Sequence, residues 1–189
     1  KGEILLNGEN ITNAEPEKRS QLGLFLAFQY PTDVQGISLS RFLLNANNSL
    51  HKQQPSSASI KEFLAGMKSA AKKLSIEESF LQRYLNVGLS GGEKKRSEIL
   101  QMISLKPKFA LLDEIDSGLD IDSLKTVSSA IENMRGKDFG CLIITHYARI
   151  LEYVKPDTVH IMIDGKIAKS GGPELADQLE QKGYGWVKK

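Results

Sequence analysis

The sequence predicts an α/β protein with a mostly parallel sheet and an inserted α-helical subdomain. In the second half of the chain, short apolar runs alternate with helical patterns, which is typical of a parallel sheet covered by helices on both faces. Within residues 32–87, by contrast, the apolar residues follow helical spacing. A third observation is the apolar run 109–112, which leads directly into two carboxylates, Asp113 and Glu114. A run of this kind predicts a strand buried on both faces, with the carboxylates at its carboxyl end, where parallel sheets bind ligands.

The first 31 residues are predicted to form a hairpin, a short helix and a strand. Asn7-Gly8 is a strong signal for a tight hairpin turn. Pro16 suits the first turn of a helix that stops near Gly23. The apolar residues 24–28 then predict a buried strand, which places Gln29 at its end.

Residues 32–87 are predicted to form the inserted helical subdomain. Its helix starts are expected at Ser38, at the capping box 59–62 and at the capping box 75–78. The first of these helices should run to about His51, a surface histidine, and residues 53–57 read as a polar linker.

After this insertion, strands and helices alternate again. The predicted order is a strand over 109–113, a helix over 123–135, a strand over 141–145, a short helix over 147–154, a strand over 158–163, a turn at Asp164-Gly165 and a last helix over 173–182. Residues 1–31 and 88–189 would therefore make up one core, interrupted by the helical subdomain.

Ser90-Gly91-Gly92-Glu93 stands directly before a helical pattern. Paired glycines allow backbone N–H groups to approach a phosphate closely, and the helix directs its positive end toward the anion. A plain Ser-Gly-Gly loop is the alternative. The next three residues, Lys94, Lys95 and Arg96, lie in the first helical turn, where the helix dipole disfavours cations. They imply either an anionic partner or a solvated basic face.

Taken together, these motifs resemble those of the ABC-type ATPases, a branch of the P-loop ATPases. Residues 89–93 resemble the signature motif, and residues 109–114 resemble the Walker B box. The other motifs of the family follow in order: Gln29 resembles the Q-loop glutamine, residues 117–120 the D-loop, and His146 the switch histidine.

This resemblance implies a role for each motif residue. Asp113 and Gln29 would hold Mg²⁺, while Glu114 would act as the general base for the attacking water. His146 would contact the γ-phosphate of ATP. In a head-to-tail homodimer, Ser90, Gly91 and Gly92 of one subunit would cover ATP held by the other, and Asp120 would cross the interface between the two sites.

Within that family, the chain most resembles the SufC ATPases of the SUF iron–sulfur cluster assembly machinery. The similarity is carried by residues 28–31, 86–96, 98–102, 113–122, 145–147 and 183–186. Glu93 and residues 115–118 favour this branch, because transporter relatives more often carry Gln and Pro-Thr-Ser-Ala there. The resemblance implies an ATPase of the cytoplasm or plastid stroma that docks on SufB/SufD-type scaffold subunits.

One motif of the family is absent from the sequence. No Gly-x-x-x-x-Gly-Lys-Ser/Thr phosphate loop, the Walker A motif, occurs in the 189 residues. Since that loop precedes the first strand in the family, we expect the sequence to be truncated at its amino end by about forty to fifty residues. The chain on its own should then bind ATP poorly.

Composition excludes several other functions. A net charge of +2 gives no reason to expect nucleic acid or membrane binding, and no apolar run is long enough to span a bilayer. One cysteine and three histidines make no iron–sulfur ligand set, and Cys141 is expected to be a buried hydrophobic residue. The alternatives to a SUF ATPase are the nucleotide-binding subunit of a membrane transporter and a non-catalytic interaction module.

Overall fold

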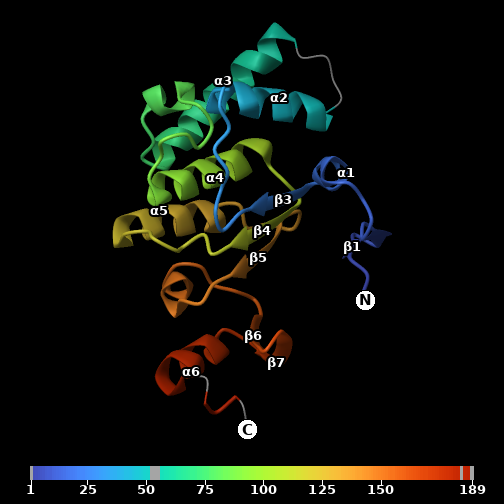
Figure 1. Cartoon of the computed structure of the whole chain (residues 1–189), viewed down its shortest axis with the longest axis vertical. Coiled ribbons are helices and arrows are strands. Elements are labelled where there is room, and N and C mark those ends of the chain that lie inside the picture. The colour runs from blue at the N-terminus through green and yellow to red at the C-terminus, as the bar shows by residue number, and fades with distance from the viewer. Residues whose placement is uncertain (1, 52–55, 184, 188–189) are drawn as a thin grey trace.

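Three parallel strands form the sheet at the centre of the computed structural model, which describes residues 2–51, 56–183 and 185–187 (Figure 1). The strands lie in the order β3 (Leu24–Ala27), β4 (Phe109–Asp113) and β5 (Gly140–Ile144). Both pairings are parallel, so all three strands end at the same edge of the sheet. The predicted α/β class with a parallel sheet is therefore confirmed.

The helices α4 (Gly91–Leu105) and α5 (Ile121–Glu132) lie on one face of this sheet (Figure 1). Ala27, Ala110 and Leu112 of that face are fully buried in the hydrophobic core. On the opposite face, Leu26, Leu142 and Ile144 are 43%, 45% and 52% exposed. Within the described part of the chain, helices thus cover one face, and the expectation that β4 is buried on both faces is wrong there. Successive strand residues point to opposite faces, so burial alternates along β4.

Beyond α4, on the side away from the sheet, lie α2 (Leu39–His51), α3 (Ser57–Lys73) and the 3₁₀ helix η1 (Glu78–Gln82) (Figure 1). The helix expected to end at His51 is confirmed, and His51 is exposed. Leu43, Met67 and Leu81 from these helices belong to the same hydrophobic core as the sheet. The division of the chain into a core and a subdomain over 32–87 stays a prediction.

Two predicted helix starts in this segment are wrong. Ser56, not Ser59, caps α3, because its hydroxyl accepts a 3.1 Å hydrogen bond from the Ser59 amide. Several closely spaced serines offered competing capping positions. Ser75 adopts a left-handed backbone with φ +54°, and η1 begins three residues later without a side-chain cap. Of the predicted linker 53–57, residues 53–55 lie outside the described residues, Ser56 caps α3 and Ser57 is the first residue of this helix.

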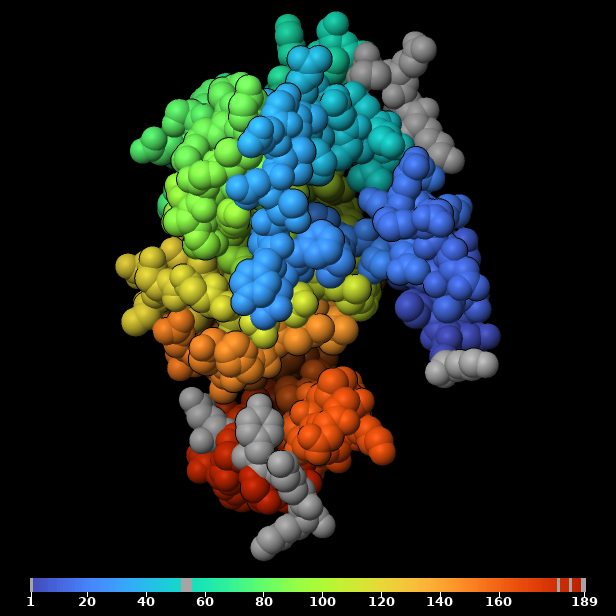
Figure 2. Space-filling view, in the orientation of Figure 1, coloured from blue at the N-terminus to red at the C-terminus, as the bar shows by residue number. Residues whose placement is uncertain are grey.

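Short elements occupy the two ends of the chain. They are β1 (Leu5–Leu6), β2 (Glu9–Asn10), α1 (Pro16–Gln21), the 3₁₀ helix η2 (Ala148–Glu152), β6 (Val159–Ile163), β7 (Lys166–Gly171) and α6 (Glu174–Lys182). The two predicted hairpin turns are confirmed, and both have positive φ at each central residue. The short helix expected over 147–154 is the 3₁₀ helix η2. Figure 2 shows β6, β7 and α6 at the opposite end of the molecule from α2 and α3. Among the described helices, none has the length and apolar character needed to cross a lipid bilayer.

Cys141 differs from its expected environment. It lies on β5, an edge strand of the described sheet, and the residue is exposed. Its sulfur nevertheless lies close to protein atoms, and the loss of hydration raises the pKa of the thiol to about 12. The thiol is therefore protonated, and a weak nucleophile, at neutral pH.

Candidate active site

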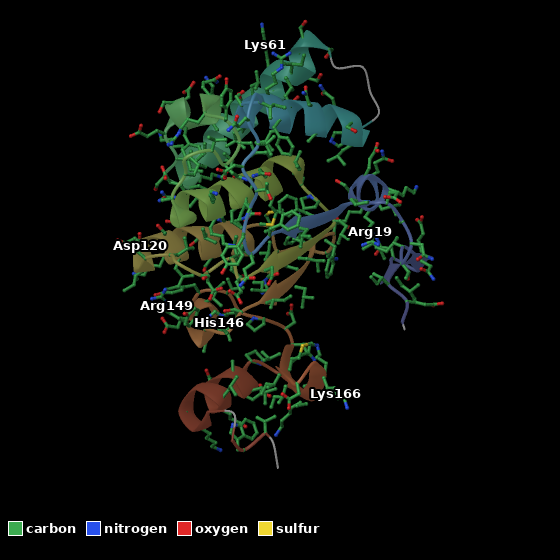
Figure 3. All side chains as sticks on the ribbon, in the orientation of Figure 1. Arg19, Lys61, Asp120, His146, Arg149 and Lys166 are labelled. Atoms are coloured by element: carbon green, nitrogen blue, oxygen red, sulfur yellow. The ribbon has the colours of Figure 1, made fainter. Side chains whose placement is uncertain are left out.

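Residues from the ends of all three parallel strands meet at the carboxyl edge of the sheet. Gln29 follows β3, Asp113 ends β4 with Glu114 directly after it, and His146 follows β5. In Figure 3, His146 lies on the same side of the molecule as Asp120 and Arg149. The parallel topology therefore brings together residues that are far apart in the sequence.

The Glu114 carboxylate is the centre of this cluster. The Gln29 side-chain amide donates a 2.8 Å hydrogen bond to Glu114 Oε2. On the other oxygen, His146 Nδ1 lies 3.5 Å from Glu114 Oε1, while the His146 side chain remains half-exposed. The structure thus places three of the predicted site residues in one chain of contacts.

Glu114 also has an unusual backbone. Its φ of +46° is left-handed, a conformation that costs a residue with a side chain on the order of 1 kcal/mol or more. The Glu114 amide donates a 2.9 Å hydrogen bond to the Ile144 carbonyl at the end of β5, which holds the turn in place. This strained turn lies directly after β4, at the position where the carboxylate meets Gln29 and His146.

Asp113 and Gln29 supply oxygen atoms on the same edge. The described residues contain no cluster of three or more His, Cys, Asp or Glu side chains that could hold a metal ion by themselves. Mg²⁺ often takes only one or two carboxylates and completes its octahedron with water and substrate phosphates. Two oxygen groups on this edge fit such a magnesium site. One is the partly exposed Asp113 carboxylate, and the other is the side-chain oxygen of Gln29, which stays available when the side-chain nitrogen donates to Glu114.

The N-terminus of α4 is closed by a reciprocal capping box. Ser90 Oγ accepts from the Glu93 amide at 3.3 Å, and Glu93 Oε2 accepts from the Ser90 amide at 2.8 Å and from the Ser90 hydroxyl at 2.7 Å. Hydrogen bonds from the Ser90 backbone and hydroxyl lower the pKa of Glu93. The hydroxyl of Ser90, one of the residues expected to cover ATP, donates here to Glu93 of its own chain.

The two glycines of this loop have no role in the packing of their own subunit. A Cβ atom at Gly91 would meet nothing within 4 Å, and one at Gly92 would make an ordinary 3.6 Å contact with Leu119. Neither glycine has a positive φ. Neither packing nor backbone conformation within this chain requires glycine at these two positions.

Asp120 caps α5 in the described structure. Its carboxylate accepts from the Ser123 amide at 2.7 Å and from the Ser123 hydroxyl at 3.2 Å, and these hydrogen bonds lower its pKa. The spacing Asp-x-x-Ser directly before a helical pattern could have signalled this capping. Arg96 donates to the same Ser123 hydroxyl at 3.5 Å, which joins the N-terminal turns of α4 and α5.

The three basic residues at the start of α4 have different environments. Lys94 pairs with the Asp33 carboxylate at 2.6 Å, so this cation has an anionic partner within the chain. Lys95 does not belong to a solvated basic face, because its side chain is only 5% exposed. Lys95 Nζ donates to the Phe28 and Gln29 carbonyls at 2.8 and 2.9 Å, and burial lowers its pKa. It also lies 3.4 Å from the Asp113 carbonyl and thereby joins the ends of β3 and β4.

Sequence reasoning gave no role to two further polar residues around the site, Glu98 and Asp116. Glu98 is buried beside Lys95, and burial raises its pKa to about 7. Asp116 is also buried, and its Oδ2 accepts a 2.7 Å hydrogen bond from the Thr145 hydroxyl. A signal existed for Glu98: it lies three residues after Lys95 on the helical face that also carries Ile99 and Met102.

Comparison with known proteins identifies the family. A family model described as "ABC transporter" matches residues 1–117. The chain belongs to the ABC transporter family. Full-length members of the ABC transporter family are ATP-hydrolysing enzymes.

Several similar proteins match nearly the whole chain. Vegetative protein 296 of Bacillus subtilis (strain 168) is 50% identical over 188 residues, which are 100% of this chain and 72% of the relative. A probable ABC transporter ATP-binding protein of Streptococcus pyogenes serotype M18 is 52% identical over 186 residues, or 98% and 72% of the two chains. A probable ATP-dependent transporter, ycf16, of Cyanidium caldarium is 48% identical over 188 residues, which are 99% of this chain and 74% of the relative.

Solved ABC structures agree with the fold. The ATP-binding subunit of an ABC transporter matches with a TM-score of 0.77 and 20% identity, over 100% of this chain and 77% of that one. A dimeric ATP-binding cassette in a post-hydrolysis state, bound to ADP and Pi, matches with a TM-score of 0.76 and 14% identity, over 92% of this chain and 74% of that one. The parallel sheet with its covering helices is therefore the ABC ATPase fold.

Proposed function

We propose that this protein hydrolyses ATP at the interface of a head-to-tail dimer, with Glu114 as the general base. The observation that carries this proposal is the cluster of Gln29, Glu114 and His146 at the carboxyl edge of the sheet. A carboxylate held by a neutral amide on one oxygen and approached by an imidazole on the other is arranged to accept a proton from water.

The strand-end residues divide the chemistry among them. Glu114 accepts the proton of the attacking water, and Gln29 fixes the orientation of the carboxylate. His146, which is half-exposed, stabilises charge on the γ-phosphoryl group. The Asp113 carboxylate and the side-chain oxygen of Gln29 would hold Mg²⁺. When bound, this ion neutralises charge on the β- and γ-phosphates of ATP.

The other half of each site comes from the second subunit. Ser90, Gly91 and Gly92 stand at the positive N-terminus of α4, where no atom of this chain fills the space beside Gly91. These residues would cover the γ-phosphate held by the partner, and Asp120 would link the two sites. A dimeric cassette among the structurally similar proteins supports this arrangement.

ATPase turnover by the protein produced from its complete coding sequence tests this function. Glu114→Gln should lower kcat at least about 100-fold, because the amide cannot accept the proton. The variant should still bind ATP and should accumulate as an ATP-bound dimer, measured by light scattering. Glu62→Gln, an exposed change on α3, is the control and should turn over at the parent rate. A Glu114→Gln variant as active as the parent would remove the assigned base. A parent protein without any turnover would favour a non-catalytic interaction module instead.

We further propose that the ATPase serves a SUF-type iron–sulfur cluster assembly system in the cytoplasm or plastid stroma, as a SufC-type subunit on a SufB/SufD-type scaffold. Two of the residues that distinguish the SufC ATPases from transporter relatives, Glu93 and Asp116, make specific contacts. Glu93 completes the capping box of the signature helix, and the Asp116 carboxylate accepts from Thr145 beside the switch histidine. The Gln and Thr of transporter relatives at these positions could not carry the same charges.

The second candidate function is the nucleotide-binding subunit of a membrane transporter. It is favoured by the name of the Streptococcus relative, a probable ABC transporter ATP-binding protein. Affinity purification of the tagged full-length protein from its own cells distinguishes the SUF assignment from the transporter assignment. Recovery of a scaffold pair without detergent supports the SUF assignment, whereas a partner recovered only in detergent supports the transporter assignment.

A further inference from the structure

We infer that Glu98 is a positioning residue that ties the signature helix α4 to Gln29 of the same subunit. Through this tie, a movement of α4 that accompanies nucleotide binding at the partner's site would reach the catalytic cluster of its own subunit. This role rests on the ATPase function proposed above and adds a route of communication between the two sites of the dimer.

The first evidence is the contact that Glu98 makes. Glu98 Oε1 accepts a 2.8 Å hydrogen bond from the Phe28 amide, across 70 residues of sequence. Phe28 is the residue directly before Gln29. By binding the Phe28 amide, the Glu98 carboxylate holds the backbone one residue before Gln29. Lys95, one turn earlier on α4, holds the carbonyls of the same two residues, Phe28 and Gln29. Two side chains of one helix therefore bind three backbone groups of the two residues that follow Ala27, the last residue of β3.

The second evidence is the energetic cost of this arrangement. The Glu98 side chain is 5% exposed, and its Oε2 atom has no hydrogen-bond partner among the described residues. Lys95 Nζ lies 4.0 Å from Oε2, at the limit of an ion pair. A buried, incompletely paired carboxylate is usually no more stable than an apolar side chain of similar size. Its contribution is therefore a specific contact to the Phe28 amide, and not overall stability.

The third evidence is the rigid connection between Glu98 and the signature loop. Ser90 caps α4, and Glu98 lies about 12 Å along the same helix at 1.5 Å per residue. Figure 1 shows α4 as one continuous helix that packs directly above the sheet. From Glu98 the connection passes through the Phe28 peptide to Gln29, and from the Gln29 amide to Glu114 Oε2. Every step is a covalent bond, a helix or a hydrogen bond of the described structure.

The test compares Glu98→Met with Glu98→Gln in the full-length protein. Methionine fills the same volume and favours helix, but it gives the Phe28 amide no oxygen acceptor, whereas glutamine keeps one. Glu98→Met should lower kcat about tenfold with less than about a twofold change in the KM for ATP, while Glu98→Gln should stay within about twofold of the parent. Ser97→Ala, a buried change on the same helix that removes a hydrogen bond from Gln101, is the control and should keep the parent kcat.

A double-mutant cycle distinguishes positioning from packing. If Glu98 acts through Gln29, Glu98→Met should change kcat by less than about twofold in a Gln29→Ala background. An equal loss in both backgrounds, or no loss in the parent, would overturn the inference.

Hydrogen exchange gives a readout that does not depend on turnover. In Glu98→Met, the Phe28 amide should exchange at least about tenfold faster than in Ser97→Ala, because its acceptor is gone. Unchanged exchange at Phe28 would overturn the inference even if the parent were active. Absence of turnover in the parent, with faster exchange at Phe28, would instead count against the proposed ATPase function and leave the structural tie supported.

Discussion

The side-chain amide of Gln29 donates a 2.8 Å hydrogen bond to Glu114 Oε2, although 85 residues separate the two in sequence. This bond joins the end of β3 to the residue after β4. It fixes the orientation of a carboxylate whose backbone is already held in a left-handed turn. The geometry of the Glu114 carboxylate therefore depends on the segment that follows β3, and the first prediction tests that dependence.

Gln29→Ala should lower kcat about tenfold, because it removes the donor that orients the Glu114 carboxylate. Steady-state ATPase assays on the full-length protein measure the effect. Gln82→Ala at the exposed end of η1 is the matched control and should leave kcat unchanged. Parent-like turnover by Gln29→Ala would show that Glu114 does not need this donor.

Gly91→Ala should separate activity from stability. Its new methyl group would meet no atom of its own subunit, so the thermal unfolding midpoint should stay within about 2 °C of the parent value. ATPase activity should fall at least about tenfold, because the methyl group would occupy the space proposed for the partner's γ-phosphate. Gly140→Ala, by contrast, should lower stability and keep the ATPase activity of the folded protein. Its Cβ would lie 2.5 Å from a Phe109 ring atom, which should destabilise the protein by about 1–3 kcal/mol. Full activity of Gly91→Ala would argue against a ligand at this position.

Glu98 should make stability decrease with rising pH. Below its usual pKa of 4.5, the side chain is protonated in both the folded and the unfolded state. As pH rises from there, the unfolded chain loses the proton first, and the stability contributed by the neutral buried form is lost as pH passes through about 7. The full loss is about 3 kcal/mol.

Urea unfolding of the parent and of Glu98→Gln at about pH 5 and about pH 8 measures this effect. The stability of Glu98→Gln relative to the parent should rise between the two pH values, because glutamine carries no proton to lose. Glu62→Gln serves as the exposed control. A constant difference between Glu98→Gln and the parent would contradict the raised pKa of Glu98.

Thr145→Val should destabilise the protein by about 1–3 kcal/mol. The hydroxyl of Thr145 donates to Asp116 Oδ2, and Asp116 Oδ1 already lacks a hydrogen-bond partner among the described residues. Valine would leave both oxygens of a buried carboxylate unpaired. Thr126→Val on the exposed surface of α5 should change stability by no more than about 0.5 kcal/mol. Equal effects of the two changes in urea unfolding would show that the bond to Asp116 contributes nothing.

The strands, the hairpins and most helices could be predicted because local rules determine them. Asn7-Gly8 and Asp164-Gly165 form tight turns wherever two strands flank them, and the apolar run before Asp113 forms a strand from its own pattern. The gathering of Gln29, Glu114 and His146 followed from the parallel topology. Their roles in hydrolysis remain proposals, because sequence and geometry alone do not measure turnover.

The environment of individual side chains was harder to predict. From sequence, Lys95 is expected to belong to a solvated or anion-binding basic face, because its neighbours Lys94 and Arg96 carry the same charge. It is buried because the carbonyl groups at the end of β3 lie across from α4, a tertiary contact that no local pattern contains. The exposure of Cys141 has a similar origin, since an apolar sequence cannot reveal that its strand lies at the edge of the described sheet.

The capping box at the start of α4 has an electrostatic consequence for assembly. Since hydrogen bonds from Ser90 lower the pKa of Glu93, this side chain is negatively charged at neutral pH, directly beside the loop that an incoming triphosphate would approach. The positive end of the helix attracts the anion, whereas the carboxylate repels it. A Glu93→Gln subunit would keep an acceptor for the cap without that repulsion. In the proposed dimer, the acidic side chain should therefore raise the ATP concentration at which two subunits close around the nucleotide, and added salt should lower that concentration again by screening.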